Sequence, residues 1–325
     1  MEHKEVLEIA LGLAEEAAEA DKPLAEVDYA RAGVSRALAR LGRHGEAMAM
    51  AATIRNRGLR AYTFASIAEA SRHAYLDAAA LAEEQASSIE PPGRAYIDAK
   101  LAEAEARWGG DPLPRLRAAA SLAAGLEDWR PLAKVAVAYA ACGFPGMALV
   151  TADALPGPEE RGFALSEAAY AMRRGNREFL EAVYRAVSAV PEGGMRYVYL
   201  SRLLAHEALL DPGLAEARAE GLVESVARMS GVDALHVQPA VVGNIYEAGL
   251  ADAAAPAADA VVEALSPMVE LLPFQVLENL VKVAFYYIGP REAWEVARRA
   301  GAAVGLALMA SALDSWTAAW GRMPH

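Results

Sequence analysis

Apolar residues recur along the chain at intervals of three and four positions, the spacing that lines one face of an α-helix. The segment EAMAMAATI at residues 46–54 shows this spacing, as do many others of similar length. Runs of β-branched residues of the kind that strands require are lacking, and alanine, the best helix former, is abundant. The pattern predicts an all-α protein.

A unit of about 34 residues repeats along the first two thirds of the chain. Residues 58–70 and 92–104 both carry Arg-Ala-Tyr followed by an apolar residue and Ala-Glu-Ala. Weaker copies follow in phase, and each copy begins at one of a series of arginines spaced by 34, 36, 31 and 35 residues: Arg60, Arg94, Arg130, Arg161 and Arg196. Self-similarity at a fixed period indicates a repeat architecture.

Each unit is divided by a glycine turn, at Gly42, Gly109, Gly143 and Gly175. Glycine in the left-handed conformation ends a helix without steric cost, so each unit predicts helix, tight turn, helix. One such pair cannot bury its apolar face alone, and neighbouring units must therefore stack. We expect a right-handed α-α superhelix, a solenoid of tandem helix-turn-helix repeats with 16 to 18 helices.

Two parts of this array differ in period. Residues 1–210 carry repeats of about 34 residues, whereas residues 211–325 carry longer repeats of about 40 residues, continuous with the first part. The apolar segment at residues 305–320 is predicted to be a helix that caps the end of the array.

The segment ALARLGRHGEAMAMA at residues 37–51 resembles the tetratricopeptide repeat family across its inter-helix turn, with a small-residue helix, a glycine turn and a Glu-Ala pair. The resemblance extends loosely over residues 28–210. It implies a TPR-like fold in which the first helix of each unit lines a concave surface that binds a segment of a partner protein. A likeness at the level of the fold does not specify a ligand.

Charge and composition limit the classes of partner and the cellular location that we expect. The chain carries 43 acidic and 31 basic residues, for a net charge of −12, and such an acidic surface repels nucleic-acid phosphates. The single cysteine, Cys142, leaves no intrachain disulfide, and no signal peptide is apparent. The longest weakly polar run, residues 300–313, is shorter than the roughly 20 residues of a spanning helix. We expect a cytoplasmic protein with no membrane association.

The repeated arginines are the first candidate site. A cation near a helix N-terminus opposes the helix dipole, so a compensating partner is expected. Each arginine is predicted to bind carbonyls of the preceding helix or a carboxylate of a neighbouring repeat. The alternative is a ladder of arginines that binds anionic groups.

The second candidate site is one face of the first helices, which would line the concave groove. Tyrosine and arginine are favoured in binding hot spots, although the same stripe could pack between repeats. The candidate groove residues are Tyr62, Glu69, Arg72, Tyr96, Glu103, Arg107, Tyr139, Tyr170 and Arg173.

Catalytic and cofactor motifs are missing from the sequence, including the P-loop, the dinucleotide-binding glycine motif and the nucleophile elbow. The six histidines lie far apart, so neither a metal nor a cofactor is expected. We therefore expect a non-enzymatic scaffold or adaptor that binds a protein or peptide segment in the groove. The alternatives are an RNA-binding helical repeat and a helical-toroid enzyme with a central pocket. A homo-oligomer through the C-terminal helix, with Trp294, Trp316 and Trp320 at an apolar end, is a further possibility.

Overall fold

The computed structural model describes residues 3–19 and 25–320. These residues form eighteen α-helices and one short 3₁₀ helix, and they contain no strand. The prediction of an all-α protein with 16 to 18 helices is therefore confirmed for the described part of the chain.

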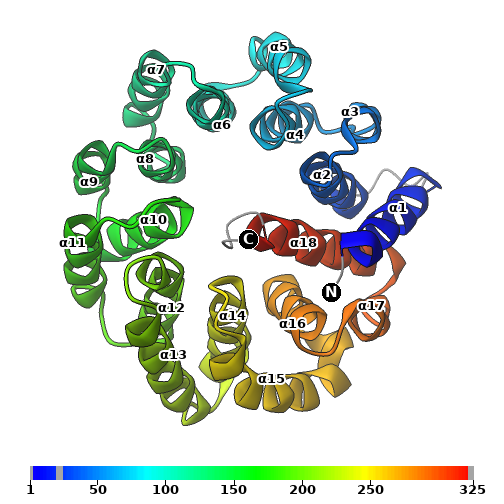
Figure 1. Ribbon diagram of the computed structural model, residues 1–325, viewed down its shortest axis with the longest axis vertical. Coiled ribbons are helices and arrows are strands. Elements are labelled where there is room, and N and C mark those ends of the chain that lie inside the picture. The colour runs from blue at the N-terminus through cyan, green and yellow to red at the C-terminus, as the bar shows by residue number, and fades with distance from the viewer. Residues whose placement is uncertain (1–2, 20–24, 321–325) are drawn as a thin grey trace.

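The helices alternate along the chain between an outer and an inner layer (Figure 1). The outer helices are α1 (His3–Glu19), α3 (His44–Ala52), α5 (Tyr75–Ala86), α7 (Leu113–Ala124), α9 (Pro145–Asp153), α11 (Arg177–Ser188), α13 (Pro212–Ala227), α15 (Ala251–Leu265) and α17 (Pro290–Arg298). The inner helices are α2 (Ala25–Arg40), α4 (Arg57–Ala70), α6 (Pro91–Trp108), α8 (Arg130–Ala141), α10 (Pro158–Ala171), α12 (Gly194–Ala208), α14 (Val232–Glu247), α16 (Phe274–Tyr287) and α18 (Ala302–Trp320). The 3₁₀ helix η1 (Ser266–Leu271) links α15 to α16.

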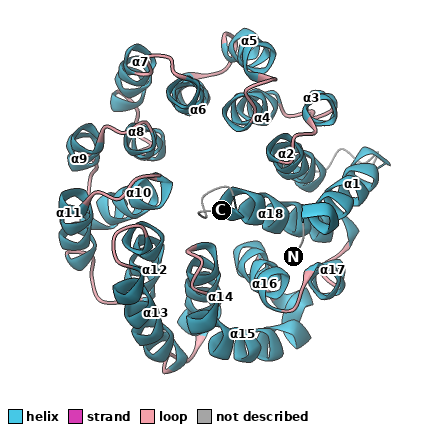
Figure 2. Cartoon of the chain, viewed as in Figure 1, coloured by secondary structure: helices cyan, strands magenta, loops and turns pink. Residues whose placement is uncertain are grey.

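The two ends of the array meet. Each inner helix packs against the next, and α18 packs against α2, so that the inner helices form a closed ring (Figures 1 and 2). The helix at residues 305–320, predicted to cap one end of the array, instead joins the two ends. The handedness of a superhelix, the family resemblance and the change of repeat at residue 210 stay predictions.

Local sequence explains where many helices begin and end. The side chains of Asn56, Asn176 and Asp211 each accept a hydrogen bond from a backbone N–H in the first turn of the following helix. Gly42, Gly109 and Gly143 have φ values of 82°, 90° and 87°, the left-handed conformation expected of them.

Gly175 differs from the other predicted turn glycines. Its φ is not in the left-handed range, so the prediction of a left-handed turn there was wrong. A Cβ at this position would lie 2.5 Å from Cδ2 of Leu210, so glycine here leaves room for that side chain rather than providing a special backbone angle.

At the seam where the ring closes, α2 and α18 pack closely together. A Cβ on Gly33 of α2 would lie 2.8 Å from the carbonyl oxygen of Ala310 of α18. Around this point α18 contributes a run of buried apolar side chains from Leu306 to Ala310. By length and composition, residues 302–319 are apolar enough to cross a membrane, and 56% of that window is buried within the ring. The apolar character of α18 is thus used to close the ring.

Candidate binding site in the ring interior

The inner helices turn a polar face toward the ring interior. In α6, Tyr96, Lys100, Glu103 and Arg107 are spaced by four, three and four residues, so they lie on one side of the helix. In and just after α10, Glu167, Tyr170 and Arg173 follow one another at intervals of three residues, which also places them on one side of the helix. The amphipathic pattern that builds the ring therefore also gathers charged groups at its centre.

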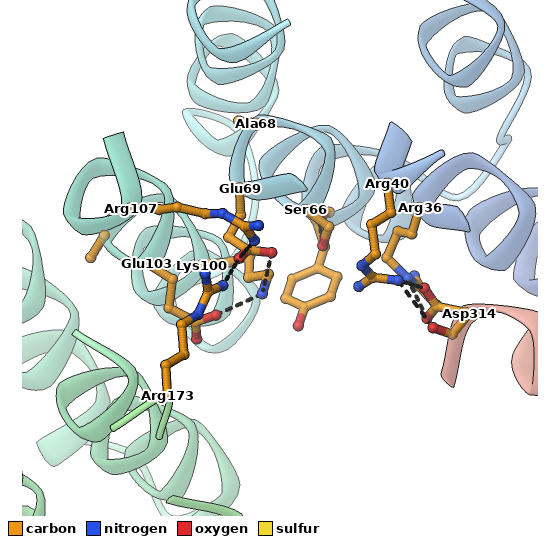
Figure 3. A network of polar contacts seen from close by, with 12 residues as sticks. Arg36, Arg40, Ser66, Ala68, Glu69, Lys100, Glu103, Arg107, Arg173 and Asp314 are labelled. Carbon is orange, nitrogen blue, oxygen red and sulfur yellow. Dashed lines mark hydrogen bonds and ion pairs between the residues drawn. The ribbon is translucent and has the colours of Figure 1, made fainter. Parts of the chain in front are cut away.

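Glu69, near the end of α4, is the centre of the first group. Its side chain is only 7% exposed, and Arg107 and Arg173 both donate to its Oε1 atom (Figure 3). The ammonium of Lys100 lies 3.7 Å from its Oε2 atom. Burial opposes ionisation of Glu69, but Lys100, Arg107 and Arg173 outweigh it and hold the pKa of this carboxyl far below its usual range.

Glu103 extends this group toward α8. Its Oε2 atom lies 2.6 Å from Nζ of Lys100, and its Oε1 atom lies 3.3 Å from Nζ of Lys134. Burial again opposes the charges, but the ion pairs outweigh it, lowering the pKa of Glu103 and raising the pKa values of both lysines. We refer to these six residues as the Glu69 cluster: Glu69, Lys100, Glu103, Arg107, Lys134 and Arg173.

Some of these contacts reach across the ring rather than along it. Glu69 and Arg173 are 104 residues apart, and α6 and α8 lie between their helices in the ring. The hydroxyl of Tyr170, on α10, donates to Glu247, on α14, over 2.8 Å, although α12 lies between these helices. Side chains from non-adjacent inner helices thus meet inside the ring.

The seam contributes a second group of charges, at the inner edge of α18 (Figure 3). Nε of Arg36 donates to Oδ2 of Asp314 over 2.8 Å, and Arg40 donates to Oδ1. Burial opposes ionisation of Asp314, but the two guanidinium groups outweigh it and lower its pKa. Burial on its own would lower the pKa of Arg40, but the negative charges of Asp314 and Glu69 outweigh it and the pKa is raised. Arg40 therefore links the two groups.

A cavity of about 300 Å³ lies between α10 and α18. Five inner helices supply its walls, and eight of its nine lining residues have polar side chains. The residues that line it are Glu167, Tyr170, Arg202, Asn244, Glu247, Lys282, Asp314, Ser315 and Ala318.

Charges of opposite sign alternate around this cavity. Nζ of Lys282 lies 3.0 Å from Glu247, and Nη1 of Arg202 lies 3.0 Å from Glu167. Burial on its own would lower the pKa of Lys282, but the carboxylate of Glu247 outweighs it and the pKa is raised. The guanidinium of Arg202 also lies over the ring of Phe163, 5.6 Å from its centroid, which fixes its position. The cavity is thus lined by oriented, charged side chains.

The structure places the predicted groove residues in several different environments. Glu69, Glu103, Arg107 and Arg173 come together in the Glu69 cluster, and Tyr170 lines the cavity. Tyr62 and Tyr96 are half-buried on α4 and α6. Tyr139 is 1% exposed in the hydrophobic core, so its ring packs between helices, whereas Arg72 is exposed beyond the end of α4.

The five repeated arginines do not form one uniform set. Arg60 donates to the carbonyl of Ile54, just after α3, and Nε of Arg161 lies 3.6 Å from Asp153 at the end of α9. Both contacts agree with the prediction that these arginines bind groups at the end of the preceding helix. Arg94 and Arg130 instead pair with nearby carboxylates, Asp98 and Asp128. Arg196 is half-buried near the start of α12.

Sequence reasoning missed the lysines of the interior. The chain has only five lysines, and three of them, Lys100, Lys134 and Lys282, lie in ion pairs with side chains that are 14, 21 and 15% exposed. Lysine is ordinarily an exposed residue. Because lysine is scarce in this chain and these three lysines lie within apolar helical segments, the sequence could have indicated that they are buried in ion pairs.

Metal binding finds no support among the described residues. Residues 3–19 and 25–320 contain no group of three or more His, Cys, Asp or Glu side chains that could hold a metal ion. The rings of His44 and His73, far apart in sequence, do lie 5.3 Å from each other, which the sequence did not predict.

Comparisons with protein-family models, curated proteins and solved structures found no match to this chain. Its function is therefore inferred from the geometry of the ring interior.

Proposed function

We propose that the protein binds a small, charged molecule in the cavity between α10 and α18. The observation that supports this most directly is the cavity of about 300 Å³, which lies among inner helices and is lined mainly by charged and other polar side chains. Ligand-binding cavities begin at roughly this volume. A small metabolite fits such a space, whereas a folded partner does not.

The lining indicates the chemistry of the molecule. Arg202 and Lys282 provide cationic donors, and Glu167, Glu247 and Asp314 provide anionic acceptors. A ligand with both a negative and a positive group would find partners for each, and charge-assisted hydrogen bonds would orient it. We therefore expect a zwitterionic molecule, such as an amino-acid-like compound, rather than an apolar one.

This proposal differs from the adaptor function expected from the repeat pattern. A protein segment would occupy a continuous concave groove, whereas in the ring Arg173 reaches Glu69 and Tyr170 reaches Glu247 across the interior. Those contacts favour a smaller occupant. Binding of a protein segment or of RNA stays a prediction.

The third expectation from the sequence, a toroid enzyme, shares the ring and the central cavity with this proposal. Each carboxylate of the cavity is paired with a cation: Glu167 with Arg202, Glu247 with Lys282 and Asp314 with Arg36. Paired carboxylates suit binding and orientation better than proton transfer, because the ion pair stabilises the ionised form. We therefore propose binding without assigning a reaction.

The proposal is tested by filling the cavity. Ala318→Trp places a large side chain among the lining residues, and Ala302→Trp places the same side chain at an exposed position of the same helix. Native mass spectrometry of the intact protein purified at low salt, with thermal unfolding against a panel of zwitterionic metabolites, detects the ligand. We expect a bound molecule or a stabilising compound for the wild type and for Ala302→Trp.

Ala318→Trp is expected to abolish that binding. If the wild-type ring carries no small molecule and no zwitterion raises its unfolding temperature, the proposal is wrong. Equal binding by Ala318→Trp would place the ligand elsewhere and would equally contradict the assignment of this cavity.

A further inference from the structure

We propose that Arg107 and Arg173 form a clamp for an oxyanion, a phosphate or a carboxylate group, inside the ring. None of the six residues of the Glu69 cluster lines the cavity between α10 and α18. The clamp is therefore a second site, on the wall formed by α4, α6, α8 and the end of α10, and it does not depend on the function proposed for the cavity.

The first argument is the imbalance of charge in the Glu69 cluster. Four cations, Lys100, Lys134, Arg107 and Arg173, face only two carboxylates, Glu69 and Glu103. The whole chain has a net charge of −12, so this local excess of positive charge runs against the overall balance. Lys100 and Lys134 are balanced by Glu69 and Glu103, so the excess charge resides on Arg107 and Arg173, and a bound anion would neutralise it.

Neighbouring carboxylates do not remove this excess. Asp314, which faces Arg40 beside the cluster, is already paired with Arg36 and Arg40. Glu167, which acts on Lys134, is already paired with Arg202.

Helix dipoles also account for only part of the excess. Arg107 lies in the last turn of α6, where the negative end of the dipole favours a cation. Arg173 follows the C-cap of α10 and is similarly placed, but each helix C-terminus carries only roughly half a unit of negative charge, which does not balance a full positive charge.

The second argument is the geometry of the two guanidinium groups. Arg107 and Arg173 approach Glu69 from different directions and donate to the same oxygen, Oε1 (Figure 3). A guanidinium has five N–H donors, so most donors of both groups remain for another acceptor. The side chains of Arg107 and Arg173 are 30 and 50% exposed, unlike the enclosed carboxylate between them. An anion can therefore reach them.

One of the two arginines is held in place before any anion binds. The guanidinium of Arg107 lies over the ring of Trp108, 5.2 Å from its centroid. The indole N–H of Trp108 in turn donates to the carbonyl of Ala68 over 2.7 Å, next to Glu69. An arginine that is already oriented loses less entropy on binding, and a pair of forked donors matches the oxygens of a phosphate or a carboxylate.

Isothermal titration calorimetry of the intact protein with inorganic phosphate, at constant ionic strength set by NaCl, tests the clamp. We expect saturable binding near one phosphate per chain, and Arg173→Gln should weaken it by about tenfold, because a charge-assisted hydrogen bond is lost. The matched control is Arg228→Gln. Arg228, the C-cap of α13, also pairs with a glutamate, Glu224, but its side chain is 80% exposed. That variant should bind phosphate as the wild type does.

A second variant separates anion binding from a merely structural role. Glu69→Gln removes the carboxylate that competes with the anion and increases the positive excess, so phosphate should bind several-fold more tightly even though the fold is weakened. A purely structural cluster would give no such gain. Titration with malonate distinguishes the source of the oxyanion: heat from malonate alone assigns a carboxylate ligand, and heat from phosphate alone assigns a phosphorylated one.

The inference is overturned if neither phosphate nor malonate gives saturable heat with the wild type and with Glu69→Gln. It is also overturned if Arg173→Gln and Arg228→Gln weaken binding equally, because the ions would then act on overall charge rather than at the clamp.

Discussion

The wall of the ring around Glu69 and the seam between α2 and α18 both hold a mostly buried carboxylate, but they hold it differently. Glu69 gathers cations from α6 and from the segment after α10, and the cations outnumber the carboxylates around it. Asp314 receives two arginines that both come from α2, beside an apolar contact where Gly33 meets Ala310. The wall therefore depends on charge, whereas the seam combines one ion-paired carboxylate with close packing, so different substitutions should damage each.

The largest effect is expected at the wall. Glu69→Leu removes the carboxylate and leaves its cations without a partner, which should lower the free energy of unfolding by about 3–5 kcal/mol. Urea denaturation followed by circular dichroism measures it. Glu46→Leu is the control: Glu46 pairs with Arg43 at the surface, its side chain is 44% exposed, and its loss should change stability by less than about 1 kcal/mol. Equal effects of the two variants would contradict the importance of the cluster.

A smaller effect is expected when the shape of the seam is changed. Gly33→Ala adds a methyl group 2.8 Å from the carbonyl of Ala310, so α2 and α18 must move apart, at a cost of about 1–3 kcal/mol. In Gly12→Ala, the added methyl group meets no atom within 4 Å, and the better helix former should stabilise the protein by roughly 0.5–1 kcal/mol. Thermal unfolding of the two variants should therefore shift in opposite directions. A stabilised Gly33→Ala variant would show that the seam is looser than described.

The smallest effect is expected from acid at the seam. The pKa of Asp314 is lower in the folded protein than in the unfolded chain, where it is about 4. Its contribution to stability is therefore fully present above the unfolded pKa and is lost as the pH falls through the folded pKa. Asp314→Asn removes this contribution. Between pH 5 and pH 2 the variant should therefore lose less stability than the wild type. Parallel losses in urea titrations at each pH would contradict the lowered pKa.

The sequence predicted the parts of this molecule that depend on local patterns. Apolar periodicity and abundant alanine predicted the helices and their number, and Gly42, Gly109 and Gly143 take the left-handed turns expected of them. Glu69, Glu103, Arg107 and Arg173 were placed on one face by helical spacing, and they do meet.

Local sequence patterns could not predict that the ring closes or which side chains meet in its interior. Arg40 and Asp314 are 274 residues apart, and no local pattern distinguishes an array whose ends meet from one whose ends stay apart. Tyr139 has the spacing of a groove residue, yet its ring is buried between helices, because a small rotation of α8 decides which side of a tyrosine faces the interior. Lys282 was missed because its partner, Glu247, lies in the preceding inner helix, outside the regular repeats.

The most direct test of the closed ring is a double-mutant cycle between Arg40 and Asp314. The free energies of unfolding of the wild type, Arg40→Gln, Asp314→Asn and the double variant are measured in urea. A ring closed through α2 and α18 predicts that the two substitutions are coupled, with an interaction energy of about 0.5–3 kcal/mol, because the side chains touch. Additive effects, within roughly 0.3–0.5 kcal/mol, would mean that the two helices do not meet, and would contradict the closed ring.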